Sequence, residues 1–222
     1  MKRIILAGAV LLLAASFAAA QGKPLKVYIS ADMEGIGGVS TGVQTGSQGR
    51  EYEKFRRLMT EEVNAAIAGA FDAGASEVLV SDSHGDGQNI DVELLDKRAR
   101  LIRAWPRPLG MMQGVDDSFG AVVFVGYHAS EGQAAAIISH TFNGRTVVKL
   151  NGVEVPEAGV SAAIAGDFGV PVVFVSGDQT IGEETPAAAG AHRDGSGEAG
   201  HRVLLRHHDA SRRSAAVDPR RR

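Results

Sequence analysis

The chain of 222 residues is long enough for one α/β domain, and its composition, with 44% hydrophobic and 22% charged residues, is that of a globular protein and not of a disordered one. It contains no cysteine, which excludes disulfides, thiol catalysis, iron–sulfur clusters and cysteine-ligated zinc, so any metal must be bound through nitrogen and oxygen atoms. A formal net charge of −3 gives no general attraction to polyanions, and we expect no nucleic-acid partner.

The first twenty residues (1–20) have the pattern of a secretory signal peptide. A positive start at Lys2 and Arg3 is followed by an apolar run over residues 4–17 and by three alanines before Gln21. The run is shorter than the roughly 20 apolar residues usual for a membrane span, so we expect a cleaved leader and no stable membrane insertion. The mature chain is expected to begin at Gln21 and to be exported, either to the periplasm or to the medium.

Strand and helix signals alternate between residues 25 and 180. The predicted elements are a strand over 25–30, a helix from 52 that ends at Gly74, a strand over 77–81, a short helix over 92–96, a strand over 121–126, a helix over 158–167 and a strand over 170–175. Apolar runs at 147–150 and 153–155 flank Asn151-Gly152, the turn signal of a hairpin. We expect a three-layer α/β/α fold with a mostly parallel, mixed sheet and a β-hairpin insertion.

The composition changes near Pro186. Residues 187–222 contain eight arginines but no lysine, phenylalanine, tryptophan or tyrosine, and they show neither helical nor strand periodicity. We therefore divide the chain into the signal peptide, an α/β domain over 21–184 and a basic low-complexity tail over 185–222, which is expected to be disordered.

Acidic residues and histidines follow three successive predicted strands. Asp32 and Glu34 come after the first strand, His84 after the second and His128 after the third. Because the carboxyl ends of parallel strands meet at one edge of a sheet, we expect these four side chains to converge. Two carboxylates and two imidazoles suit zinc or another borderline divalent ion. Each residue alone has an ordinary structural explanation, such as turn formation, and it is their joint placement that indicates a site.

Two further residues lie downstream, and the sequence leaves their roles open. His140 has the chemistry to attack a substrate, to transfer a proton or to stabilise an oxyanion, and it equally suits a core position beside Phe142. Glu157 begins the helix after the hairpin, where a carboxylate is stabilised by the positive end of the helix dipole without any metal.

Together these motifs resemble the M55 family of D-aminopeptidases. The resemblance is carried, in chain order, by Ser30-Ala31-Asp32-Met33-Glu34-Gly35-Ile36, Met59-Thr60-Glu61-Glu62, Ser81-Asp82-Ser83-His84, Gly126-Tyr127-His128-Ala129, Ser139-His140 and Pro156-Glu157-Ala158-Gly159. It implies a site for two zinc ions (Zn2+) per subunit, held by carboxylates and histidines. The implied ligands are Asp32, as the bridging carboxylate, Glu34, His84, His128 and Glu157. It also implies that His140 is the catalytic nucleophile, with general acid–base action by His140 as the alternative.

The resemblance further implies a metallo-aminopeptidase, a hydrolase that cleaves short peptides with an N-terminal D-amino acid such as D-Ala-D-Ala and that assembles as a ring-shaped homodecamer. The resemblance ends after Glu184, and we hypothesise that a reading-frame change near Pro186 replaced the original C-terminal part. Two alternatives follow. One is a truncated, catalytically silent protein that binds metal or peptide. The other is a metal phosphoesterase, because a similar carboxylate–histidine site can hydrolyse phosphate esters.

Overall fold

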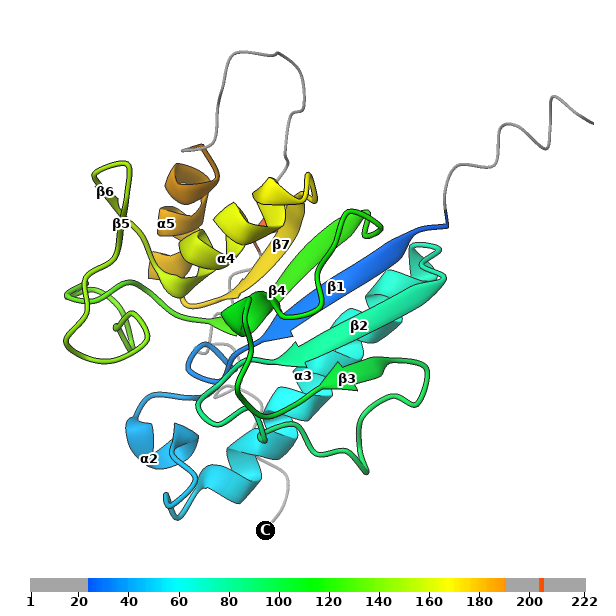
Figure 1. The fold of residues 1–222 in the computed structure, drawn as a ribbon. Helices are drawn as coiled ribbons and strands as arrows, with labels where there is room; N and C mark the ends of the chain where they lie inside the picture. Colours follow the sequence, from blue (N-terminus) through cyan, green and yellow to red (C-terminus); the bar gives the residue numbers. More distant parts are fainter. Residues whose placement is uncertain (1–23, 191–203, 206–222) are drawn as a thin grey trace, which may run out of the picture.

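The computed structural model describes residues 24–190 and 204–205. A six-stranded sheet forms its centre, with the order β3-β2-β1-β4-β7-β8 and parallel pairing between all neighbours (Figure 1). Its strands are β1 (Lys26–Ala31), β2 (Glu77–Asp82), β3 (Arg100–Ile102), β4 (Ala121–Tyr127), β7 (Val172–Gly177) and β8 (Leu204–Leu205). A separate antiparallel hairpin consists of β5 (Lys149–Leu150) and β6 (Val153–Glu154). The predicted mostly parallel α/β fold with a hairpin insertion is confirmed, and its antiparallel strands are those of the hairpin.

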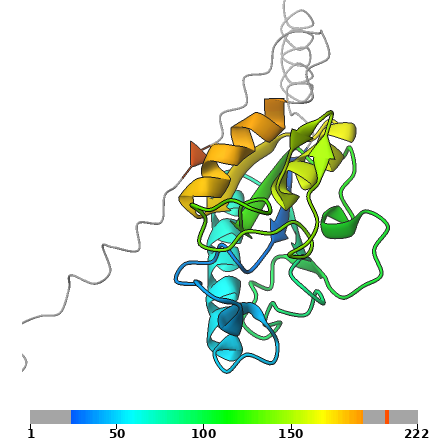
Figure 2. The same cartoon turned by 90° about the vertical axis from the view of Figure 1, so that its left-hand side faces the viewer.

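Helices lie on both faces of the sheet and give the expected three layers (Figures 1 and 2). They are α2 (Gly42–Thr45), α3 (Tyr52–Asp72), α4 (Glu157–Asp167) and α5 (Gln179–Gly190), together with the 3₁₀ turn η1 (Gly110–Met112). The buried side chains of α3 recur at intervals of three and four residues and pack on one face of β1 and β2. The elements η1, α4 and α5 contribute side chains to the core on the other face.

The alternation of side chains along β1 explains why both faces of the sheet are covered. Val27 and Ile29 are buried in the core on the α3 side, and Tyr28 between them is buried in the core on the α4 side. A strand that is apolar on both faces is typical of a parallel sheet. Because the strand itself is covered on both faces, the polar residues of this region lie beyond its carboxyl end.

The predicted helix over 92–96 is wrong, because these residues form turns. Asn64 of α3 binds two backbone groups in this segment. Its side-chain amide donates to the Leu94 carbonyl at 2.8 Å, and its Oδ1 atom accepts from the Asp96 N–H at 2.8 Å. These bonds satisfy backbone groups outside any helix and hold the segment along the surface of α3.

The described structure continues beyond residue 184, where the α/β domain was predicted to end. Helix α5 reaches Gly190, and the short strand β8 pairs with β7. The other residues of the predicted tail, 191–203 and 206–222, lie outside the described residues, as does the predicted signal peptide. None of the described helices is long and apolar enough to cross a membrane.

Candidate metal centre

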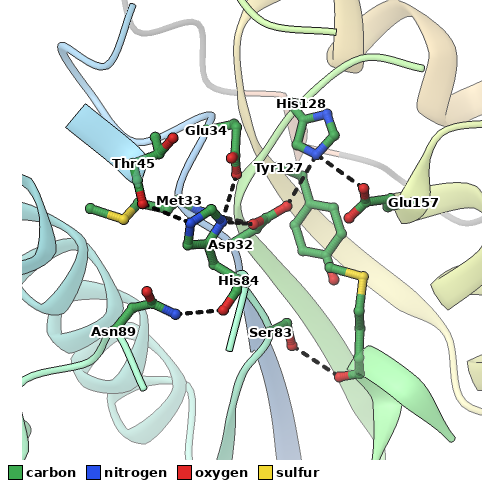
Figure 3. A network of polar contacts seen from close by, with 12 residues as sticks. Asp32, Met33, Glu34, Thr45, Ser83, His84, Asn89, Tyr127, His128 and Glu157 are labelled. Carbon is green, nitrogen blue, oxygen red and sulfur yellow. Dashed lines mark hydrogen bonds and ion pairs between the residues drawn. The ribbon is translucent and has the colours of Figure 1, made fainter. Parts of the chain in front are cut away.

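The carboxyl ends of β1, β2 and β4 meet at one edge of the sheet, where the sequence predicted a site. Asp32 and Glu34 follow β1, and His84 and His128 follow β2 and β4 (Figure 3). Glu157 is the first residue of α4, and its carboxylate reaches the same place from outside the sheet. The structure therefore brings all five predicted ligands together.

Asp32 lies between the two histidines and directs one carboxylate oxygen towards each. Its Oδ1 atom is 3.3 Å from His84 Nδ1, and its Oδ2 atom is 3.4 Å from His128 Nε2. Glu34 Oε2 approaches His84 Nδ1 at 2.9 Å, and Glu157 Oε1 approaches His128 Nε2 at 3.4 Å. Two candidate ligand groups thus share Asp32, one with Glu34 and His84 and one with His128 and Glu157.

The side chains at this place fit a cation better than they fit one another. When both rings are neutral and their protons face backbone carbonyls, Asp32 Oδ2, Glu34 Oε2 and His128 Nε2 are buried acceptor atoms without a hydrogen-bond donor among the described residues. An unpaired buried polar atom destabilises a fold by about 1–3 kcal/mol, so the cluster needs added positive charge, from protons on the rings or from a cation that replaces them. Ligand atoms around a tetrahedral zinc ion lie about 3.3 Å apart, which is close to the separations seen here, and oxygen and imidazole nitrogen are ligands that zinc accepts.

Backbone carbonyls orient both histidine rings. His84 Nε2 lies 2.9 Å from the carbonyl oxygen of Thr45, the last residue of α2, and His128 Nδ1 lies 3.0 Å from the carbonyl oxygen of Ala129. Because a carbonyl only accepts, each of these nitrogens carries the proton that it donates. His84 Nδ1 and His128 Nε2 are therefore the atoms free to bind a metal, as is usual for histidine ligands.

Burial and hydrogen bonding act in opposite directions on the pKa values of these groups. Burial alone would lower the pKa of His84, but hydrogen bonds with Asp32 and Glu34 outweigh it and raise this pKa to about 11. The same balance, with Asp32 and Glu157 as partners, raises the pKa of His128 to about 11. Burial alone would raise the pKa of Asp32, and its hydrogen bonds to both histidines instead hold that pKa well below its usual range. A cation that binds here must displace protons from the two rings.

His140 stacks on one of the candidate ligands. Its ring lies 4.0 Å from the His128 ring between centroids, with an angle of 25° between the planes, and its Nε2 atom is 3.7 Å from Glu157 Oε1. The side chain is only part-buried and lines the cavity in front of the ligand cluster. His140 therefore does not occupy the enclosed core position beside Phe142 that the sequence had left open as an alternative. His140 also forms a third possible ligand group with Glu34 and His128.

Two glycines allow the ends of β1 and β4 to approach one another. A Cβ atom on Gly35 would lie 2.0 Å from the Tyr127 carbonyl oxygen, and one on Gly126 would lie 2.4 Å from the Asp32 carbonyl oxygen. Gly126 also has a φ of +72°, which L side chains rarely adopt. The distance between Asp32 and His128 therefore depends on the absence of side chains at both positions.

Comparison with known families agrees with this geometry. The model of the peptidase family M55, described as D-aminopeptidase, matches residues 25–193. The chain belongs to the M55 family.

Two relatives from this comparison are D-aminopeptidases. The D-aminopeptidase of Bacillus subtilis (strain 168) is 41% identical over 161 residues, which are 72% of this chain and 58% of the relative. A similar solved structure is the Zn-dependent D-aminopeptidase DppA from Bacillus subtilis, a self-compartmentalizing protease. It shares 40% identity with a TM-score of 0.71, over 73% of this chain and 60% of that one. The chain thus spans less than two thirds of the length of either M55 protein.

Two contacts that hold the segment carrying His140 in this M55 protein were not predicted from the sequence. Glu184 of α5 accepts two hydrogen bonds from the buried Ser130, one from its N–H to Oε2 at 2.9 Å and one from its hydroxyl to Oε1 at 2.5 Å. Asp178 accepts the N–H of Ile137 at 2.9 Å. Two carboxylates therefore fix the segment over 129–141 that carries His140. A glutamate in the middle of a helix has no sequence signal for such a contact.

Replacement of Glu184 by Ala is expected to displace His140 without emptying the metal centre. The change leaves the buried N–H and hydroxyl of Ser130 without an acceptor, which destabilises the fold by about 1–3 kcal/mol. We expect a lower melting temperature and kcat reduced about tenfold, with metal content unchanged. Calorimetry and metal analysis measure these quantities. Glu183→Ala is the matched control, because Glu183 is exposed and its carboxylate, among the residues that the structure describes, bonds Gln179 one turn earlier on the same helix. Equal losses in both variants would contradict the anchoring role.

Proposed function

We propose that this M55 protein is a zinc-dependent aminopeptidase that hydrolyses short peptides with an N-terminal D-amino acid, such as D-Ala-D-Ala. The convergence of five candidate ligand side chains, whose oxygen and nitrogen atoms face one another in a largely buried cluster, is the observation that carries the proposal. Membership of a D-aminopeptidase family, and a similar structure described as Zn-dependent, support the substrate and the metal.

Two zinc ions per subunit are proposed, since the cluster divides into two ligand groups with one shared carboxylate. Glu34 and His84 would hold one ion, His128 and Glu157 the other, and Asp32 would bridge them. An imidazole nitrogen has one lone pair, so the bridging position needs a carboxylate. When bound, the ions polarise the scissile carbonyl, lower the pKa of bound water and stabilise the charge of the tetrahedral intermediate.

His140 is the proposed catalytic residue. Its ring lies beside the ligand cluster on the cavity wall, within reach of a substrate carbonyl there. As a nucleophile its unprotonated nitrogen would attack that carbonyl, the amide C–N bond would break to release the protonated amine, and water would hydrolyse the acyl-histidine. As a general acid–base it would take a proton from attacking water and give it to the leaving amine. Both roles need an imidazole that is held in place, which the stacking on His128 and the anchors of segment 129–141 provide.

Hydrolysis and metal content of the purified chain test this proposal together. We expect about two zinc ions per chain, release of D-Ala from D-Ala-D-Ala, little release from L-Ala-L-Ala, loss of activity after treatment with a chelator and recovery when zinc is restored. A folded chain that binds zinc without releasing D-Ala would support the catalytically silent alternative. Hydrolysis of a chromogenic phosphate ester alone would support the phosphoesterase.

Zinc binding is expected to release protons. The metal-free site holds its protons on His84 and His128 at neutral pH, because the pKa of each ring is raised to about 11, and both must lose the metal-facing proton to bind a cation. Zinc affinity should therefore rise with pH between 6 and 9 by up to about tenfold per proton released and per pH unit. Titration in weakly buffered solution with a pH indicator measures the release. A pH-independent affinity would contradict the assigned protonation.

We also propose self-association and export. The similar DppA structure is described as self-compartmentalizing, which supports a homo-oligomer, and the decamer expected from the family is the specific form proposed. Export to the periplasm or medium rests on the signal-peptide pattern of residues 1–20. Sedimentation velocity and cell fractionation test the two proposals.

A further inference from the structure

The candidate metal centre occupies only one end of a larger cavity. The cavity has a volume of about 460 Å³, within the roughly 300–1,000 Å³ of small-molecule sites. Its polar lining includes Asp32, Glu34, His84, His140 and Glu157. Its remaining lining includes Trp105, Gly110, Met111 and Phe142. The polar residues account for the binding of metal and of the scissile amide. The end of the cavity that Trp105 and Phe142 line has no function in this reaction.

Trp105 is held in one orientation although its side chain is 41% exposed. Its indole N–H donates to the carbonyl oxygen of Gly85 at 2.9 Å, and the guanidinium carbon of Arg107 lies 4.6 Å from the ring centroid. Arg107 is itself buried and donates to Ser81 Oγ at 2.9 Å and to the Ala104 carbonyl at 2.6 Å. The ring is thus fixed by a hydrogen bond and a cation–π contact, and part of its surface stays open to the cavity.

The Trp105 ring lies close to the candidate metal centre. Gly85, which binds the indole, directly follows the ligand His84. On the Glu157 side of the cavity, Phe142 is 54% exposed and has a φ of +62°, with its N–H donated to Glu157 Oε1 at 2.6 Å. Non-glycine residues seldom adopt this conformation. Trp105 and Phe142 thus expose apolar surface in one cavity beside ligand residues, and exposed apolar surface in a groove is typical of a ligand-binding site.

We propose that Trp105 is a specificity-determining residue, whose ring forms the wall of a subsite for the side chain of the N-terminal D-residue. The inference rests on the proposed aminopeptidase function. In such an enzyme the carbonyl at the metal centre belongs to the N-terminal residue, so the side chain of that residue is the one nearest to the ligands and to Trp105. The subsite accepts the methyl group of D-Ala and favours larger apolar side chains, so peptides such as D-Leu-D-Ala are its preferred substrate class.

Intrinsic fluorescence tests binding at this subsite without any turnover. Trp105 is the only tryptophan in the 222 residues, so emission reports on this ring alone. We expect a saturable change in emission when the zinc-loaded His140→Ala variant is titrated with D-Leu-D-Ala, and a weaker affinity for D-Ala-D-Ala. Leucine in place of alanine adds apolar surface that the ring would cover on binding. No change in emission with either peptide would overturn the proposal.

Kinetics of three variants separate a specificity role from a structural one. Trp105→Ala is expected to lower the ratio of kcat/KM for D-Leu-D-Ala to that for D-Ala-D-Ala about tenfold, because contacts to one apolar group change such ratios by roughly 10–200-fold. Trp105→Phe should recover most of this ratio, and zinc content should remain unchanged in both variants. Val92→Ala is the matched control, since Val92 is an exposed apolar residue that does not line the cavity.

The two proposals fail in different ways. Saturable emission changes without release of any D-amino acid by the wild type would contradict the aminopeptidase and support the subsite. Hydrolysis by the wild type with an unchanged ratio in Trp105→Ala would overturn the subsite and leave the aminopeptidase standing. Loss of zinc or of the folded state in both Trp105 variants would assign the ring a structural role and also overturn the subsite.

Discussion

Replacement of Asp32 by Ala is expected to abolish binding of both zinc ions and to reduce release of D-Ala at least about a thousandfold. One oxygen of Asp32 faces His84 and the other faces His128, so a single change removes a ligand from both groups. Loss of metal assistance removes several kcal/mol of transition-state stabilisation, and each 1.36 kcal/mol is tenfold in rate. Metal analysis of the purified variant and its rate of D-Ala release are the two measurements.

Two further variants make the Asp32 result specific. Glu157→Gln alters a ligand of one group only, so we expect about one zinc ion to remain per chain. Asp86→Ala removes an exposed carboxylate two residues after His84 and should leave metal content and rate unchanged. Retention of both zinc ions in Asp32→Ala would contradict the bridging role and the proposed two-metal centre.

His140→Ala is expected to separate metal binding from turnover. The ring lies outside the two groups that share Asp32, so both zinc ions should remain, and kcat should fall by about 10²–10⁴-fold, the usual contribution of a general acid–base group. A nucleophilic role would give a larger loss and an acyl-histidine intermediate in the wild type, whose acyl group hydroxylamine would take over, releasing D-alanine hydroxamate and free His140. Metal analysis, steady-state kinetics and mass spectrometry of the released hydroxamate measure these outcomes.

Loss of zinc together with the His140 side chain would contradict this separation. It would instead make His140 a ligand in the group that it forms with Glu34 and His128. Phe142→Ala, two residues further along the same segment, tests whether a general disturbance of the loop is enough to cause loss of zinc. Zinc should remain bound in this variant if His140 itself is the ligand. This change keeps the backbone N–H that Phe142 donates to Glu157.

The convergence of Asp32, Glu34, His84 and His128 could be predicted because it follows from local pattern and one rule of topology. Each apolar strand ends where its polar residues begin, and parallel strands place those ends at one edge of the sheet. The same reasoning could not place Glu157. Its position at the start of a helix has a sufficient electrostatic explanation, and only the packing of α4 brings its carboxylate to within 3.4 Å of His128.

Other features depend on tertiary contacts that leave no local signal. The segment over 92–96 is held by two hydrogen bonds to Asn64, which is far away in the sequence. Trp105 lies in a loop between β3 and η1, and nothing in its neighbourhood indicates that it lines the cavity of the metal centre. Propensity and periodicity describe a segment by itself, whereas these residues are placed by partners elsewhere in the chain.

The close approach of the β1 and β4 backbones at Gly35 and Gly126 restricts which substitutions this protein can accept during evolution. Any replacement there places at least a methyl group against the backbone of Asp32 or Tyr127, so both positions are constrained although they contribute no ligand. A related protein with a different substrate range must therefore keep the ends of β1 and β4 as they are and differ in the surrounding loops. The loop that carries Trp105 is the first candidate.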